Sequence, residues 1–192
     1  IENARQVLAD GGWTVGSDGI MTKDGLRAAF DLYYASSDSV RQALAADFAD
    51  QMRQIGIEVS PKGASWDDIY PNQYSSPVLW GWGSNSPVEL YQLTHSKGWG
   101  NYACYDNAEI DAHLDQARAA RTVENSYEPY RKAQWDEATQ TGVAPQGAST
   151  WVWLANIDHL YFQRDGITIA QQKPHPHGHG WSLVNNVDQW DV

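Results

Sequence analysis

The sequence predicts an α/β fold, and three consecutive stretches near its start carry that prediction. Residues 26–35 ("LRAAFDLYYA") alternate apolar and other side chains, which is typical of a strand with one buried face. Residues 40–57 ("VRQALAADFADQMRQIGI") repeat apolar side chains in steps of four and three, which predicts a helix of about four turns. A second strand, residues 57–62 ("IEVSPK"), follows directly. Such a strand–helix–strand connection is nearly always right-handed and places both strands parallel in one sheet.

The stretch before the first of these strands predicts a helix and a hairpin. Residues 2–9 ("ENARQVLA") have helical apolar spacing, and Gly11 and Gly12 are expected to end that helix. Residues 16–25 ("GSDGIMTKDG") contain two Asp-Gly steps, which favour tight turns in a short hairpin-like excursion.

The sequence also indicates where the helix within residues 40–57 begins and ends. Asp38 or Ser39 is available as its N-cap, and Gly56 is expected to close it. Residues 65–77 then form a connection with little periodicity, and residues 78–83 ("VLWGWG") predict a short apolar strand that ends in small residues.

The second half predicts helices followed by strands. Helices are expected within residues 87–96, 108–121 and 126–141. The middle one is capped by Asp106 or Asn107 and buries Ile110, Leu114 and Ala117. In the last one, Pro129 is expected in the first turn, where its missing N–H costs nothing. Residues 150–170 predict one or two further strands, and the remaining tail is rich in loop-forming residues.

Composition and charge exclude several classes of function. The 192-residue chain carries a formal net charge of −11, and its 13 basic residues are scattered, so neither nucleic acid nor an anionic membrane is an expected partner. Its single cysteine, Cys104, allows no internal disulfide and no thiolate metal cage. No apolar run approaches the ~20 residues that span a bilayer, and any signal peptide is expected outside this chain, which starts at Ile1.

Motifs for catalysis are weak. The Asp67-Asp68 and Asp136-Glu137 pairs are sequence neighbours that do not face each other on a helix, and no phosphate-binding or nucleophile motif is present. We therefore expect no enzyme activity and no cofactor. The motif "HPHGHG" leaves one alternative open: its three imidazoles are enough for a metal site, in a metal-binding or metal-chelate-binding protein or a metal-dependent hydrolase. Those imidazoles belong to His175, His177 and His179.

Ten tryptophans and ten tyrosines are the unusual feature of the composition. Such side chains combine an apolar face with a polar tip, which suits half-wet binding walls. Trp80 and Trp82 lie two apart on the predicted strand, so their side chains are expected to point the same way. Spacing alone does not decide between two roles for these tryptophans: they could pack in the core or line a ligand site. The residues concerned are Trp66, Trp80, Trp82 and Trp99. A carbohydrate-binding module that uses these rings as stacking platforms is a further alternative.

The order of motifs resembles the extracytoplasmic solute-binding proteins of peptide and nickel ABC importers. The most specific parts are the strand and helix of "FDLYYASSDSVRQALAADFADQMRQIGIEV", the segment "LWGWGSNSP" and the segment "NYACYDNAEID". This resemblance implies an α/β domain with a mixed sheet and flanking helices, like a lobe of a periplasmic binding protein. It also implies that residues 1–192 are a single domain, the C-terminal ligand-binding lobe of a longer two-lobe protein whose N-terminal part is absent here.

The resemblance further implies a binding site. In the peptide binders a G-W-x-x-D segment lines the cleft, and its aspartate pairs with the α-ammonium of the peptide. Trp82 matches that tryptophan, but Asn85 stands at the aspartate position. A neutral amide forms a weaker contact than a charged partner, so discrimination for a free amino terminus is expected to be weaker. Trp66 matches another aromatic residue of the cleft, and Trp80 and Tyr105 complete the candidate ligand-binding residues.

The implied function is capture of a peptide or another small solute for an ABC importer. The implied partners are this ligand and the permease subunits of the transporter. The implied location is extracytoplasmic, either periplasmic or as a cell-surface lipoprotein held to the membrane only by a lipid anchor on the absent N-terminal part.

Overall fold

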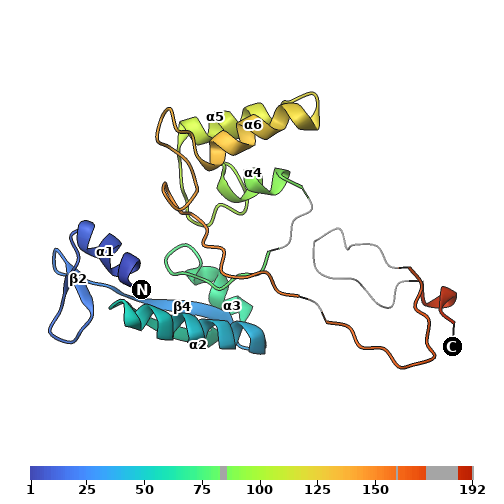
Figure 1. The fold of residues 1–192 in the computed structure, drawn as a ribbon, viewed down its shortest axis with the longest axis horizontal. Coiled ribbons are helices and arrows are strands. Elements are labelled where there is room, and N and C mark those ends of the chain that lie inside the picture. Colours follow the sequence, from blue (N-terminus) through green and yellow to red (C-terminus); the bar gives the residue numbers. More distant parts are fainter. Residues whose placement is uncertain (83–85, 159, 172–185, 192) are drawn as a thin grey trace. The chain divides into compact units, whose positions relative to one another are not determined.

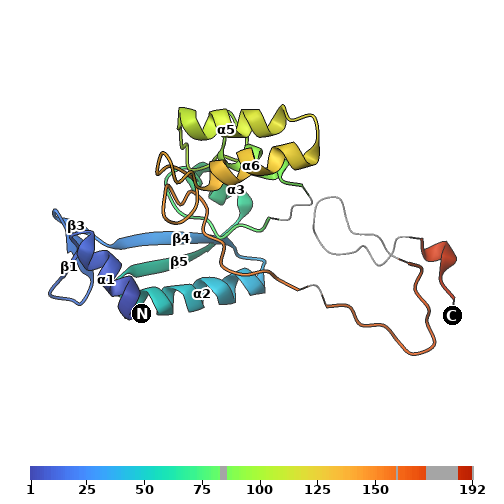
Figure 2. The same ribbon diagram turned by 45° about the horizontal axis from the view of Figure 1, so that its top comes forward.

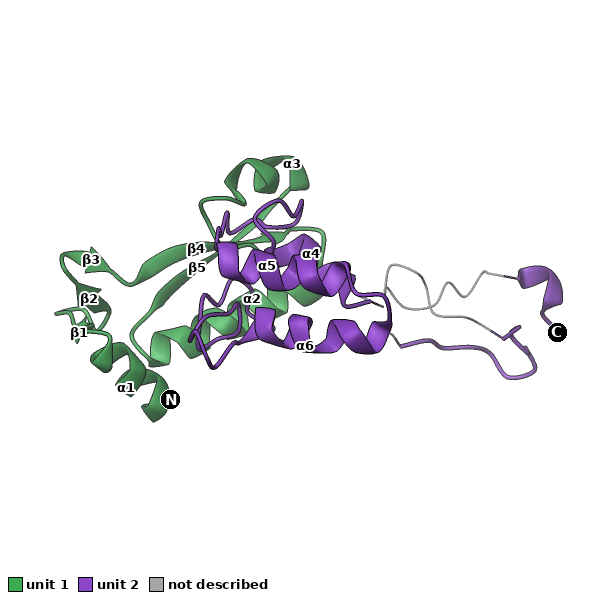
Figure 3. Ribbon diagram, turned by 90° about the horizontal axis from the view of Figure 1, so that it is seen from above, with its two compact units in different colours: residues 1–81 green, residues 82–192 purple. Residues whose placement is uncertain are grey.

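The computed structural model describes residues 1–82, 86–158, 160–171 and 186–191. These residues form two compact units, which comprise residues 1–81 (unit 1) and residues 82–192 (unit 2) and are coloured separately in Figure 3. Asn85 and the three histidines His175, His177 and His179 lie outside the described residues.

Unit 1 starts with a helix and a small antiparallel sheet, as predicted. Helix α1 (Glu2–Asp10) ends at Gly11, and Gly12 has a φ of +84°, which glycine adopts without steric cost. The sheet contains β1 (Thr14–Val15), β2 (Met21–Lys23) and β3 (Leu26–Arg27) in that order. The turn from β2 to β3 has positive φ at both Asp24 and Gly25, which is the hairpin geometry that an Asp-Gly step favours.

The predicted strand–helix–strand unit is confirmed. Strand β4 (Ala29–Ala35) pairs in parallel with β5 (Glu58–Ala64), and α2 (Ser39–Gln54) connects them and packs along both (Figures 1 and 2). The single strand expected over residues 26–35 is divided in two. Leu26 belongs to β3 and is 65% exposed, because it pairs with the hairpin rather than with β5.

The core of unit 1 lies between α2 and the parallel strands. Buried side chains from β4, α2, β5 and the following segment meet there, namely Leu32, Ala45, Val59 and Leu79. Helix α1 is tied to the end of α2, because the Arg5 guanidinium donates to the carbonyl oxygen of Gln54 at 2.6 and 3.2 Å. That bond satisfies one of the backbone acceptors that a helix leaves unpaired at its C-terminus.

The strand predicted over residues 78–83 is not formed by its described residues. Val78 makes one parallel bridge to Tyr33, next to β4 on the side away from β5, and the chain then leaves the sheet. The expectation that Trp80 and Trp82 point the same way rested on that strand and loses its basis. The connection before it contains two short helices that periodicity did not predict, α3 (Trp66–Ile69) and η1 (Tyr70–Asn72).

Unit 2 is built from helices. They are α4 (Val88–Thr94), α5 (Ala108–Arg118) and α6 (Val123–Gln134), and α5 lies beside α6 in the views of Figures 1 and 2. The predicted stripe of α5 is confirmed as buried, and Asn107 is its N-cap. The core of unit 2 contains side chains from all three helices and from the segment after α6, namely Tyr91, Ile110, Leu114, Ala117, Tyr130, Ala133 and Val143.

Two predictions for unit 2 are wrong. Helix α6 starts three residues earlier than expected, after its N-cap Thr122, and ends at Gln134, seven residues before the expected end, so Pro129 lies in its interior. The proline is buried along the same face as Tyr130 and Ala133, and this packing holds a helix that propensity alone would break. No strand forms in the described part of residues 150–170. There, Thr168 makes one isolated bridge to Asp191, near the short helix η2 (Val187–Gln189).

The α/β class is confirmed, with parallel and antiparallel pairing in two separate small sheets. Helix α2 is the longest helix of the described residues, with 16 residues. Within those residues, no helix combines the length and the apolar character that crossing a bilayer requires.

The N-cap of α2 provides a test of the fold. The Arg41 N–H donates to the Asp38 carboxylate at 2.9 Å, and this bond, the largest influence, holds the pKa of Asp38 below its usual value. We expect Asp38→Ala to lower the free energy of unfolding by about 1 kcal/mol at pH 7, measured by urea denaturation. The control is Asp50→Ala, on the exposed surface of the same helix, which is expected to cause no loss.

The pH dependence of that difference follows from the direction of the pKa shift. A carboxylate whose pKa is lower in the folded state stabilises the fold above its unfolded pKa of about 3.9. The stabilisation is lost as the pH falls through the folded pKa. The difference between the wild type and Asp38→Ala is therefore expected to shrink below about pH 4. An equal loss at pH 3 and pH 7 would exclude this capping role.

Candidate functional site

Aromatic side chains gather around α4 in unit 2. The Trp82 ring lies 5.2 Å from the Trp99 ring and 6.2 Å from the Trp151 ring, between ring centroids. Trp151 stacks on Trp153 at 6.0 Å and lies 6.3 Å from Tyr102. We call these five residues the α4 aromatic cluster. Its members bring together the segment before α4, the loop after it and the chain beyond α6.

The α4 aromatic cluster is partly open to solvent. Trp99 is 61% exposed and Trp153 is 69% exposed, whereas Trp82 and Trp151 are half-buried. The rings of Trp99 and Trp153 do not serve as core, because most of their apolar area stays in water. The cluster therefore has the properties of a binding surface.

Helix α4 holds two of the indoles by their N–H groups. Trp82 Nε1 donates to Glu89 Oε2 at 3.3 Å, and Trp151 Nε1 donates to the carbonyl oxygen of Leu93 at 3.3 Å. Leu93 is buried, so this carbonyl belongs to a well-packed part of the helix. Because both N–H groups point at the helix, the rings are fixed in orientation.

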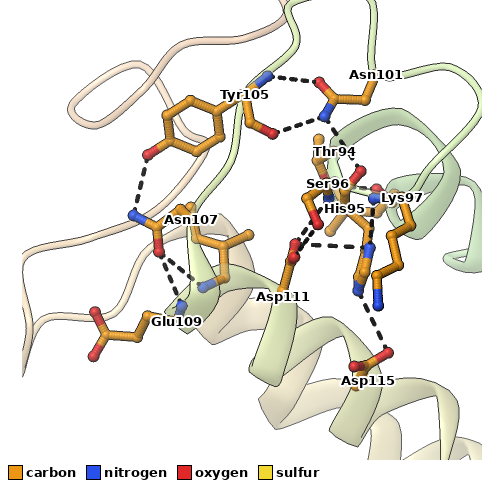
Figure 4. Close-up of polar contacts among 12 residues, drawn as sticks. Thr94, His95, Ser96, Lys97, Asn101, Tyr105, Asn107, Glu109, Asp111 and Asp115 are labelled. Carbon is orange, nitrogen blue, oxygen red and sulfur yellow. Dashed lines mark hydrogen bonds and ion pairs between the residues drawn. The ribbon is translucent and has the colours of Figure 1, made fainter.

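The loop between α4 and α5 is held by a buried amide (Figure 4). The Asn101 amide nitrogen donates to the carbonyl oxygens of Tyr105 at 2.7 Å and His95 at 3.3 Å. The Asn101 amide oxygen accepts from the Tyr105 N–H at 3.2 Å. The same loop carries Trp99 and Tyr102, so the amide fixes the part of the chain that supplies two cluster members.

Helix α5 fixes the beginning of this loop. The Asp111 carboxylate accepts from the Ser96 N–H at 2.9 Å and from the Ser96 hydroxyl. His95 is buried, its Nδ1 accepts from the Lys97 N–H at 2.9 Å, and its Nε2 lies 3.5 Å from Asp115 (Figure 4). A ring nitrogen that accepts carries no proton, so the proton of the neutral imidazole is on Nε2, facing Asp115.

The predicted site residues fall into different places. Trp66 and Trp80 meet in unit 1, with ring centroids 5.1 Å apart, and Tyr70 lies 5.7 Å from Trp66. These three residues form the α3 aromatic cluster. Trp82 belongs to the α4 aromatic cluster instead. Tyr105 is partly buried against the core of unit 2, and its hydroxyl accepts from Asn107 at 3.3 Å.

Four residues of this site were not predicted from the sequence, namely Glu89, Tyr102, Trp151 and Trp153. Glu89 carries no motif, and only its place in the first turn of α4 distinguishes it. Trp151 was predicted to lie in a strand. Its hydrogen bond to Leu93 joins residues 58 positions apart, and a single sequence carries no signal for such a contact. The alternation of Trp151 and Trp153 was the available clue.

Metal ligands do not gather in the described part of the chain. Among these residues, no group of three His, Cys, Asp or Glu side chains is arranged to hold a metal ion. Cys104 is exposed in the loop after α4.

Comparison with known proteins yields a family and a fold. The family model described as "Bacterial extracellular solute-binding proteins, family 5 Middle" matches residues 1–103. Protein XP55 of Streptomyces lividans is 38% identical over 168 residues, which are 84% of this chain and 30% of that protein. This chain therefore spans about a third of the length of that relative.

Two solved structures have the same fold. NikZ from Campylobacter jejuni, in complex with Ni(L-His), superimposes with a TM-score of 0.73 at 22% identity. The match includes 100% of this chain and 38% of the NikZ chain. The oligopeptide-binding protein AppA from Bacillus subtilis, in complex with a nonapeptide, gives a TM-score of 0.60 at 26% identity. That match covers 68% of this chain and 28% of AppA.

Proposed function

Because this chain belongs to the bacterial extracellular solute-binding proteins of family 5, we propose that it captures a peptide or peptide-like solute for an ABC importer. In this proposal the protein delivers its cargo to the permease subunits and acts outside the cytoplasm. It makes and breaks no bond, since its task is to enclose the cargo and release it.

The observation that carries the proposal is the α4 aromatic cluster. Its half-exposed rings offer apolar area whose shape tolerates many side chains, while polar groups beside them orient the cargo. AppA was solved with a nonapeptide, and a bound peptide needs this kind of tolerant wall.

We assign Trp82 the role of a ligand wall and Asn85 the role of a polar anchor. Trp66 and Trp80 are proposed as further walls, supported by their mutual packing in the α3 aromatic cluster. Tyr105 is proposed to act through the loop it supports, because its ring packs on the core.

The domain arrangement is part of the proposal. The chain covers 30% of Protein XP55 and 38% of NikZ, which fits one lobe of a protein that closes around its cargo. Closure of two lobes is a hinge motion that excludes water and strengthens the charged contacts. We assign the chain to the C-terminal lobe of such a protein, anchored to the membrane, if at all, through a lipid on the remaining part.

The test is Trp82→Ala in the intact protein. Peptides of two to nine residues are first screened by isothermal titration calorimetry, and the tightest-binding one becomes the probe. We expect the substitution to weaken binding of this probe about 30-fold, because a central aromatic contact contributes about 2 kcal/mol. The circular dichroism spectrum is expected to stay unchanged, since Trp82 is only half-buried.

The control is Trp13→Ala, a half-buried tryptophan outside both aromatic clusters, which is expected to leave the affinity unchanged. An unchanged affinity in Trp82→Ala would remove this residue from the site. If no peptide of the screen binds the wild-type protein, the proposal of a peptide cargo fails.

A further inference from the structure

Glu89 places a negative charge among the indoles of the α4 aromatic cluster. Its Oε2 accepts from Trp82 Nε1 at 3.3 Å, and its side chain is half-buried. Among the described residues, no Lys, Arg or His nitrogen lies within 4.0 Å of this carboxylate. A neutral indole N–H is therefore its neighbour, and its charge is not compensated by an ion pair within that part of the chain.

Within the described residues, this carboxylate accepts fewer bonds than it can. An ionised carboxylate has about four acceptor positions, and among the described side chains the bond to Trp82 uses one of them. The other described glutamates that stand in the first turn of a helix, such as Glu109 and Glu124, are exposed. Glu89 differs because it is half-buried and bonded to an indole that lies against a second indole, with an angle of 39° between the ring planes.

The surroundings favour a positive charge over any other group. The faces of indole rings attract cations, and Trp82, whose N–H bonds this carboxylate, has the ring of Trp99 at 5.2 Å between centroids. A planar guanidinium can stack on an indole face and bond a carboxylate with two N–H groups at once. The net charge of −11 also attracts cations and repels anions before contact.

We infer that Glu89, with Trp82 and Trp99, forms a subsite for a cationic group of the cargo, best filled by a guanidinium. This inference rests on the proposed function and narrows it to peptides that carry a positive charge. The subsite is distinct in residue and chemistry from Asn85, whose neutral amide cannot provide charge recognition.

The experiment uses two matched peptide panels and the intact protein. Each panel contains alanine pentapeptides in which one residue is replaced in turn at the five positions, by arginine in one panel and by citrulline in the other. Citrulline has nearly the same shape without the charge. We expect arginine to bind about tenfold more tightly than citrulline at one position or more.

The variant that tests the subsite is Glu89→Gln. The amide oxygen of glutamine can still accept from Trp82 Nε1, so the indole stays in place and only the charge is removed. We expect the preference for arginine to disappear in this variant and to remain in Glu109→Gln, the same change in the first turn of α5. If Glu89 had only a structural role, Glu89→Gln would weaken the binding of both peptide panels equally.

The outcomes separate the inference from the proposed function. Equal affinity for arginine and citrulline at every position, or a preference that survives Glu89→Gln, overturns the cation subsite. If Trp82→Ala then weakens the binding of both peptide panels, the proposal of peptide capture stands without the cation subsite. If neither panel nor any peptide of the wider screen binds, the proposed function fails and the subsite with it.

Discussion

Replacing Leu114 with alanine is expected to lower the free energy of unfolding of unit 2 by about 3–4 kcal/mol. Leu114 is 0% exposed and lies on the buried face of α5, between Ile110 and Ala117. It contributes to the core that contains Tyr130 of α6, so its truncation leaves a cavity between the two helices. The loss combines the lost burial of the side chain with the cost of that cavity.

Urea denaturation followed by far-ultraviolet circular dichroism measures this effect, because α5 and α6 supply much of the helix of unit 2. The matched control is Leu160→Ala, the same chemical change at a residue that is 77% exposed, with an expected loss below about 0.5 kcal/mol. A loss below about 1 kcal/mol for Leu114→Ala would show that α5 and α6 do not enclose this side chain.

Asn101→Ala is expected to destabilise unit 2 by about 2–3 kcal/mol and to weaken peptide binding as well. The substitution removes all three bonds that its amide makes to the backbone of His95 and Tyr105. Asn101 is 9% exposed, so water does not readily replace these partners. Binding is affected because the loop between these bonds carries Trp99 and Tyr102.

Two further variants define the cause of that loss. Asn101→Asp keeps an acceptor for the Tyr105 N–H but cannot donate to the two carbonyl oxygens, so it is expected to be as harmful as alanine. Asn125→Ala changes an exposed asparagine in the first turn of α6 and serves as the control. Wild-type stability in Asn101→Asp, measured by the same urea titration, would contradict the donor role of the amide.

The parts of the fold that local pattern specifies were predicted correctly. The apolar stripe of α2 and the alternating side chains of β4 predicted that β4 and β5 pair in parallel. The register confirms this, because Ala29 lies opposite Glu58 and Ala35 lies opposite Ala64. Asn107 was one of two candidate caps for α5, and its short side chain accepts from the N–H groups of Glu109 and Ile110. In each case the signal lies within a few residues of the element it specifies.

The errors arise where distant packing overrides local preference. Pro129 is accepted inside α6 because its neighbours Tyr130 and Ala133 are buried against the core. The apolar run at residues 78–82 makes only one bridge, since Leu79 enters the core of unit 1 as a single buried side chain. Neither the interior proline nor the missing strand could be predicted from the residues next to it in the sequence.

The candidate site was predicted in part for the same reason. Family resemblance selected Trp82, and composition drew attention to the tryptophans. The contacts of Trp82 with Trp151 and Glu89 depend on how α4 and the chain beyond α6 fold together, and they could not be read from spacing. The roles of all five residues named from the sequence stay predictions, namely Trp82, Asn85, Trp66, Trp80 and Tyr105.

The indole N–H groups of Trp82 and Trp151 both point inward to α4. These two rings therefore offer a visiting molecule their flat sides and no donor. Contact with a flat ring face does not depend on the hydrogen-bond pattern of a guest. Any selection among guests at this surface therefore has to come from groups other than these two N–H donors.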